Sequence, residues 1–305
     1  MVESGGVIEK LVRCDKLVRR GVLDQAEPEL RKLVEFPATA RQAQKLLAVC
    51  RQLRRLGIVD DLEHYRTRRP EFPDRETPDF EDEASILISR KPRAEKTVLV
   101  FTGNARQVWL SIHLIHRFLS PYDCNIVYLK DPAKRAYLRG IPGFGEDISG
   151  VIRALSNIVG DLAADHLHCL GSSTGGYASL RAGIELGAVA SLAFSPATSE
   201  EGFDLPLNQS GIITPDLRDL YRSAKRPPRT TLVFAENHER DAKSCLRMGG
   251  LPTVRLVPIA DYDGHDVIAQ TIATGLFPKL IDQLLGGQKS IHNDRVAIGE
   301  SLVPA

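Results

Sequence analysis

The sequence has almost no excess of charge of either sign. Forty lysine and arginine residues stand against 39 aspartate and glutamate residues, which leaves a formal net charge of +1 over 305 residues. A field this weak does not recruit nucleic acid or an anionic membrane surface, so any charge preference has to be local. We therefore expect no nucleic-acid partner.

Cysteine is scarce, and the five cysteines are scattered along the chain. Their odd number and wide spacing do not fit a zinc site or a redox pair, and we expect reduced, mostly buried thiols. No histidine and carboxylate cluster has the spacing of metal ligands, and nothing calls for a nicotinamide, flavin or pyridoxal group. The sequence predicts a reaction without metal or cofactor.

Long apolar runs are also missing. No segment approaches the ~20 apolar residues that cross a bilayer. Residues 1–16, MVESGGVIEKLVRCDK, interrupt their apolar positions with charges every few residues, unlike a signal peptide. We expect no membrane span and a cytoplasmic protein.

Helical periodicity dominates residues 1–70, in which no strand-like run occurs. Apolar positions repeat at helical spacing over 8–18, 23–34 and 41–56, with a further helix expected over 59–65. The phrases GVLDQAEPELRKLV and GIVDDLEHYRT resemble each other, and both resemble the turn and second helix of tetratricopeptide hairpins. That resemblance implies a helical-hairpin packing domain, with a protein partner bound through these helices as the alternative.

Residues 71–83 are rich in proline and charge and predict a linker to a domain over 84–288, followed by a tail over 289–305. Within 84–288, short β-branched apolar runs alternate with helical stretches. The expected strands are 84–89, 97–101, 125–129, 167–170, 189–194, 231–235 and 253–259. The expected helices are 107–119, 148–162, 174–186, 215–223, 242–248 and two within 266–285. This alternation predicts an α/β fold with a mainly parallel sheet covered by helices on both faces.

One motif carries the chemistry. The apolar strand His166-Leu-His-Cys-Leu runs into Gly171-Ser172-Ser173-Thr174-Gly175, which fits G-x-S-x-G, and a helix follows. In this context the motif resembles the nucleophile elbow of the α/β-hydrolase superfamily. The resemblance implies that Ser173 is lifted above the sheet at a strained turn, where the two glycines leave room. A phosphate-binding P-loop is excluded, because Tyr177 stands where that motif needs lysine.

A serine hydroxyl needs a base within hydrogen-bond reach and an acid to orient that base. The superfamily orders them along the chain as serine, acid, histidine. His265, in the loop after the last expected strand, is the predicted base, with His238 as the alternative. Asp241 is the preferred acid. Glu236, at the end of the preceding strand, and Glu239 remain alternatives.

The resemblance also places backbone donors for an oxyanion at Thr174 and at Asn104 or Ala105, with Gly103 allowing that loop to turn near the substrate. The loop after the strand 125–129 is basic and rich in glycine. Tyr137 and Arg139 are its candidate contacts to an anionic or sugar-bearing substrate, with solvated charges as the plainer interpretation.

Together these features predict a serine hydrolase that acts on a small-molecule or glycan-linked acyl group through an acyl-enzyme. An acyltransferase with the same residues is one alternative, because only the acceptor in the second step would differ. A hydrolase-fold scaffold protein with a vestigial triad is the other.

Overall fold

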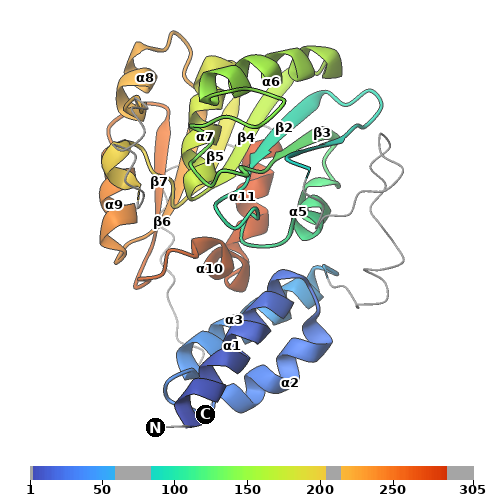
Figure 1. Ribbon diagram of the computed structural model, residues 1–305, viewed down its shortest axis with the longest axis vertical. Coiled ribbons are helices and arrows are strands. Elements are labelled where there is room, and N and C mark those ends of the chain that lie inside the picture. The colour runs from blue at the N-terminus through green and yellow to red at the C-terminus, as the bar shows by residue number, and fades with distance from the viewer. Residues whose placement is uncertain (1–2, 59–83, 204–213, 287–305) are drawn as a thin grey trace.

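A computed structural model describes residues 3–58, 84–203 and 214–286 of the chain (Figure 1). The expected helix over 59–65, the linker 71–83 and the tail 289–305 lie outside the described residues. The chain begins with α1 (Glu3–Arg19), α2 (Leu23–Leu33) and α3 (Ala40–Arg55). The strands are β1 (Ile86–Ser89), β2 (Lys96–Phe101), β3 (Cys124–Leu129), β4 (His166–Ser172), β5 (Ala190–Phe194), β6 (Arg229–Ala235) and β7 (Val254–Ile259).

The strands form one seven-stranded sheet in the order β1-β3-β2-β4-β5-β6-β7. Strand β1 runs antiparallel to β3, and every other neighbouring pair is parallel. The central strands are buried along nearly their whole length, as expected for a sheet covered on both faces. The predicted fold class, mainly parallel α/β, is confirmed.

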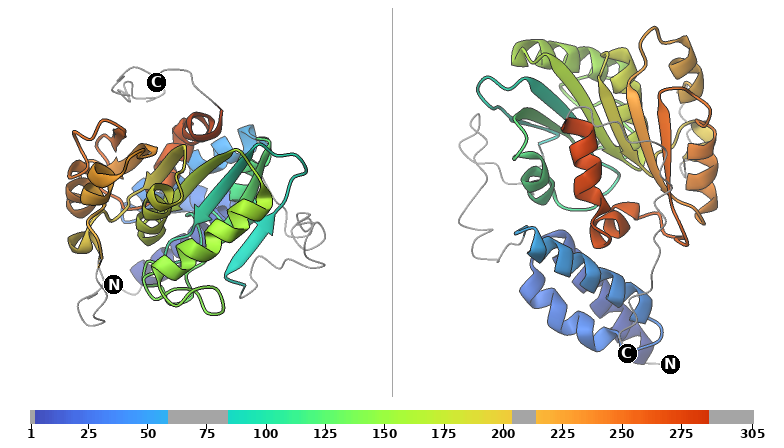
Figure 2. Two further views of the ribbon diagram at one scale, coloured as in Figure 1. Left: turned by 90° about the horizontal axis from the view of Figure 1, so that it is seen from above. Right: turned by 180° about the vertical axis from the view of Figure 1, so that it is seen from behind.

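Helices cover both faces of the sheet (Figures 1 and 2). One face packs against α5 (Ile112–Leu119), α10 (Val267–Ala273) and α11 (Leu276–Leu285), and the other against α6 (Ile148–Leu162), α7 (Thr174–Glu185), α8 (Leu217–Ser223) and α9 (Glu239–Leu246). In β2, Val98 and Val100 belong to the first core, while Leu99 and Phe101 belong to the second. This alternation follows from the period of two residues in a strand.

The expected helix over 107–119 is corrected. The helix α5 begins only at Ile112, and the preceding residues form a loop in which Arg106 and Trp109 have positive φ angles of 56° and 57°. The amide of Gly103 donates to the carbonyl of Gln107 at 3.0 Å, which closes a tight turn. Backbone hydrogen bonds of this loop therefore replace those that a longer helix would have made.

The three N-terminal helices form a separate layer that lies against α10 and the loop before α5 (Figures 1 and 2). Their apolar faces share one continuous core with the α10 side of the sheet. In the part of the chain that the structure describes, no helix combines the length and apolar character needed to cross a membrane.

Candidate active site

The candidate site lies where the topology of the sheet changes direction. The chain leaves β2 toward β3 on one side and leaves β4 toward β5 on the other, although β2 and β4 are neighbours. The loops at the carboxyl ends of these two strands therefore diverge, and such switch points are where open α/β sheets bind ligands. Ser173 follows β4 directly and lies at this point.

Ser173 has a strained backbone, with φ 53° and ψ −123°. A Cβ built on Gly171 would lie 2.4 Å from the Oγ of Ser179 and 2.5 Å from the carbonyl oxygen of Gly175. A Cβ on Gly175 would lie 2.3 Å from the carbonyl oxygen of Thr102. These glycines allow the strand to turn into α7 within a few residues, and the turn presents the Ser173 hydroxyl to the cavity.

The side chains of Ser173, His265 and Asp241 form a hydrogen-bonded chain. The Nε2 of His265 lies 2.9 Å from the Oγ of Ser173, and its Nδ1 lies 2.6 Å from the Oδ2 of Asp241. The carboxylate can only accept, so Nδ1 carries the proton and Nε2 is free to accept from the serine hydroxyl. The structure thus brings together the predicted nucleophile, base and acid.

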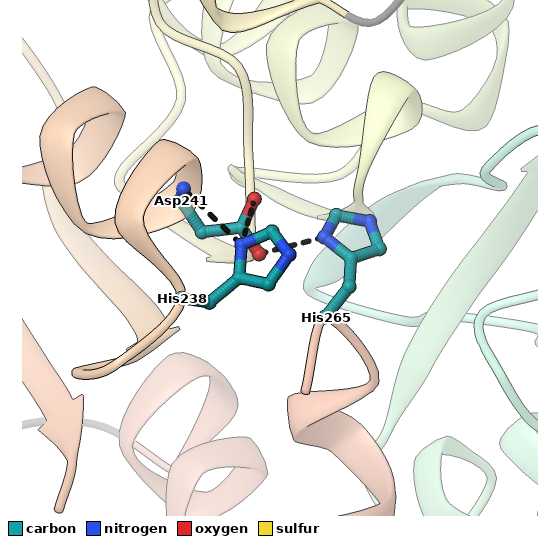
Figure 3. Close-up of side chains that lie close together, drawn as sticks. All are labelled: His238, Asp241 and His265. Atoms are coloured by element: carbon teal, nitrogen blue, oxygen red, sulfur yellow. Dashed lines mark hydrogen bonds and ion pairs between the residues drawn. The ribbon is translucent and has the colours of Figure 1, made fainter. Parts of the chain in front are cut away.

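The acid of this hydrogen-bonded chain is buried, whereas its histidine is partly exposed. The Asp241 side chain is 4% exposed, whereas that of His265 is 38% exposed. A buried carboxylate needs partners: His265 contacts Oδ2, and the Nε of Arg240 lies 3.6 Å from Oδ1. The Nδ1 of His238 also lies 3.2 Å from Oδ1 (Figure 3). His238, the alternative base, contacts the other carboxylate oxygen, and its ring centre lies 5.6 Å from that of His265.

The alternative acids are placed elsewhere. Glu236 is exposed, and its backbone amide donates to the carbonyl of Ile259 at 3.1 Å. Glu239 is exposed at the first position of α9. Asp241, two residues further along in the same turn, is the carboxylate that points toward His265 (Figure 3).

The predicted oxyanion residues lie beside the serine. Thr174 is the first residue of α7, so its amide belongs to the helix N-terminus. Its hydroxyl donates to the side-chain oxygen of Asn104 at 3.0 Å, which ties the loop after β2 to the elbow. The amide of Gly103 is already used by Gln107. Asn104 or Ala105 therefore stays the predicted second donor.

A cavity of about 490 Å³ opens above Ser173. This volume lies within the range of small-molecule sites, about 300–1,000 Å³. Among the residues that line it are Arg19, Gly103, Asn104, Ala105, Gln107, Trp109, Ser173, Thr174, Phe194, Ser195, Phe203, Arg240, Asp241, His265 and Asp266. Gly103, predicted to lie near the substrate, is one of them.

The predicted substrate contact of Tyr137 is wrong. Asp131 accepts from the amides of Arg135 at 2.6 Å and Tyr137 at 2.8 Å, so the loop after β3 wraps around this carboxylate. Tyr137 becomes fully buried, and its hydroxyl donates to the carbonyl of Leu129 at 2.7 Å. Arg139 is exposed and does not line the cavity.

Three cavity residues were not predicted from the sequence. Ser195 follows β5 with a φ of 43°, and its hydroxyl donates to the carbonyl of His265 at 3.1 Å, which holds the histidine loop. Trp109 and Arg19 also line the cavity and contact each other. Their contact joins distant parts of the chain, and no local motif signals it.

Within the described residues, His238, Asp241 and His265 form one group able to hold a metal ion, with ligand atoms all within 4.8 Å of one another. The Nδ1 of His265 and the Oδ2 of Asp241 already share a hydrogen bond, and the Nδ1 of His238 accepts from the backbone amide of Asp241. An ion bound there would compete with the hydrogen bond that orients His265. A reaction without metal or cofactor therefore stays a prediction.

Comparison with known proteins gives matches in structure only. No protein-family model matches the chain, and no curated protein matches it. Similar solved structures include MenH from S. aureus, 14% identical with a TM-score of 0.48, covering 66% of this chain and 98% of that one. An esterase of Pyrococcus furiosus is 15% identical with a TM-score of 0.47, covering 64% and 83%. The capsule O-acetyltransferase of Neisseria meningitidis serogroup A is 14% identical with a TM-score of 0.46, covering 66% and 93%.

Likeness of this degree carries no information on substrate or reaction. The class of fold rests on the chain itself: the strand order, the antiparallel edge strand β1 and the sharp turn at Ser173 after a central strand. These features define the α/β-hydrolase fold. The fold by itself does not define a function.

Proposed function

We propose that this protein is a serine hydrolase that cleaves an ester or related acyl group. The observation that carries the proposal is the chain of contacts from Ser173 Oγ to His265 Nε2, 2.9 Å, and from His265 Nδ1 to Asp241 Oδ2, 2.6 Å. This is the geometry in which a hydroxyl can lose its proton as it attacks. The cavity above the serine provides room for a small substrate.

In the first step the Oγ of Ser173 forms a bond to the substrate carbonyl carbon while its proton passes to His265. The amides of Thr174 and of Asn104 or Ala105 donate to the negative oxygen that forms. When the tetrahedral intermediate collapses, His265 returns the proton to the leaving oxygen and the acyl-enzyme remains. Asp241 stabilises the imidazolium without taking the proton.

Water then attacks the acyl carbon while His265 accepts its proton. The bond to the Oγ of Ser173 breaks, His265 returns the proton to that oxygen, and the acid is released. If an alcohol replaces water, the same residues transfer the acyl group. Product analysis with a simple alcohol added to the reaction separates the two outcomes.

Labelling with a neutral fluorophosphonate probe, followed by peptide mapping, tests the proposal. We expect label on Ser173 and rapid release of p-nitrophenol from short-chain p-nitrophenyl esters. The Ser173→Ala variant should lose both, while the Ser172→Ala variant removes the adjacent hydroxyl and should keep both. Label on another residue, or none in folded protein, would overturn the proposal.

A further inference from the structure

One wall of the cavity comes from outside the sheet domain. Arg19, at the end of α1, lines the cavity together with Ser173 and Trp109. The carbonyl of Arg19 accepts a hydrogen bond from the amide of Ser111 at 3.0 Å. The end of α1 is therefore anchored to the loop that also carries Asn104.

The helical layer is held in place by a partly buried charge cluster next to the site. The ammonium of Lys45 in α3 donates to Asp266 at 2.8 Å and to the hydroxyl of Tyr262 at 2.7 Å. Burial alone would raise the pKa of Asp266, but Lys45 and the Tyr262 hydroxyl outweigh it and hold that pKa below its ordinary value. Since Asp266 directly follows His265, this contact fixes the helices relative to the catalytic loop.

The Arg19 side chain is oriented by two contacts. Its Nε lies 2.7 Å from the Oδ2 of Asp15, one turn earlier in α1, and its guanidinium carbon lies 5.1 Å from the centre of the Trp109 ring. Burial raises the pKa of Asp15, and the Arg19 charge opposes that shift. Stacking on an indole leaves the edge of a guanidinium free to form paired hydrogen bonds.

The charges around the cavity differ in how fully they are paired. Asp241 contacts His265, His238 and Arg240, the second arginine of the cavity lining, and Asp266 contacts Lys45 and Tyr262. Among the described residues, the Arg19 side chain has an ion pair with Asp15 and a cation–π contact with Trp109. Its terminal nitrogens therefore retain donors for a ligand.

We propose that Arg19 binds an anionic group of the substrate, so that the ester carries a carboxylate or phosphate in addition to the scissile bond. This inference rests on the proposed function, because it names the substrate class of the same cavity. The N-terminal helices then serve as a fixed wall that selects the substrate.

The sequence provides a reporter for binding that needs no turnover. Trp109 is the single tryptophan of the chain, so its fluorescence reports on this wall alone. We expect glutarate or methyl phosphate to change the emission saturably, and the neutral glutaramide to leave it unchanged. A response to only one of the two anions identifies which anionic group is bound.

The Arg19→Gln variant should bind the anion at least 10-fold more weakly. Arg13→Gln, which removes an exposed arginine of the same helix, should bind as the parent does. Since Arg19→Gln leaves Asp15 without its cation, the double variant Asp15→Asn/Arg19→Gln is measured beside it and should bind equally weakly. An unchanged anion response in folded double variant would overturn the proposal.

Turnover gives an independent test. The ratio of kcat/KM for p-nitrophenyl hydrogen glutarate to that for p-nitrophenyl valerate should fall at least 10-fold in Arg19→Gln and less in Arg19→Lys, which keeps the charge. Equal losses on both esters would mean that Arg19 is only structural. Failure of the neutral probe to label Ser173 would remove the proposed function, whereas the fluorescence titration still decides whether Arg19 binds anions.

Discussion

The two walls of the cavity are built in different ways. The wall with Ser173, Asp241 and His265 is formed by loops at strand ends, and its geometry comes from short-range features: a tight turn, a helix start and a loop held by Ser195. The wall with Arg19 and Trp109 forms only when a separate helical layer docks. In the proposed function, the first wall supplies the groups that react and the second supplies the groups that select the substrate. Chemistry and selectivity can therefore change independently in this fold.

The largest effect is expected at the acid of the reactive wall. The Asp241→Asn variant should lower kcat by about 10⁴-fold, because an amide no longer holds His265 in the tautomer that accepts from Ser173. Esterase kinetics with a neutral p-nitrophenyl ester measure this. Glu236→Gln, which changes the exposed alternative acid, should stay within about 2-fold, as expected for a surface substitution. Equal losses in both variants would contradict the assignment of the acid.

Much of the reactive wall was predictable, because its signals are local. The G-x-S-x-G turn after an apolar strand located Ser173, and loop position with chain order indicated His265 and Asp241. The choice between Asp241 and Glu236 was open in sequence. Glu236 is exposed directly after β6, whereas Asp241 is buried in the first turn of α9, and only coordinates show which of them contacts His265.

The wall with Arg19 and Trp109 was not predictable, because it depends on contacts between distant parts of the chain. The contact between Arg19 and Trp109 depends on how the helical layer packs, and helical periodicity indicates a buried face without indicating its partner. For Tyr137 the sequence led to a wrong prediction. A polar-looking loop suggested a substrate contact, but Asp131 gathers the loop amides and buries the ring.

The next largest effect is expected on stability, when a glycine of the turn at Ser173 is replaced and compared with a glycine of the N-terminal helices. Gly175→Ala places a methyl group 2.3 Å from a backbone oxygen of Thr102, so the turn or β2 must move, and we expect a loss of about 3 kcal/mol or more in the free energy of unfolding. Gly6→Ala, in α1 with nothing within 4 Å of the new methyl, should instead stabilise by about 0.5–1 kcal/mol. Urea unfolding measures both, and a stable, active Gly175→Ala would show that the elbow is less constrained than described.

Acid should weaken the sheet domain before it weakens the junction with the helical layer. Burial lowers the pKa of His116 and of His168 to about 4, from an ordinary value of 6.5. Between pH 6.5 and pH 4 these histidines bind protons in the unfolded chain but not in the folded chain. The free energy of unfolding therefore falls as the pH drops through this range. The cost is on the order of 2 kcal/mol per histidine. Asp266 has a lowered pKa, so its contribution is lost only as the pH falls below the ordinary carboxyl value of 3.8.

Urea unfolding at pH 7, 5.5 and 4.5 measures this order. The His168→Leu variant removes one titrating group from β4 and should show a shallower loss of stability over this range. Asp266→Asn should leave the slope between pH 7 and 4.5 as it is in the parent. If His168→Leu keeps the full slope, the acid sensitivity arises elsewhere.

The smallest effect is expected at His238, which lies beside the predicted catalytic residues but caps a helix. Its Nδ1 caps α9 by accepting from the amide of Asp241 at 3.4 Å, and the same nitrogen lies 3.2 Å from Oδ1 of that residue. A nitrogen that accepts from the amide has no proton for the carboxylate, so the neutral imidazole can cap the helix but cannot donate to Asp241. Asparagine is an equally suitable helix cap. His238→Asn should therefore keep the free energy of unfolding within about 0.5 kcal/mol and lower kcat by less than about 10-fold, whereas loss of a general base would cost 10²–10⁴-fold.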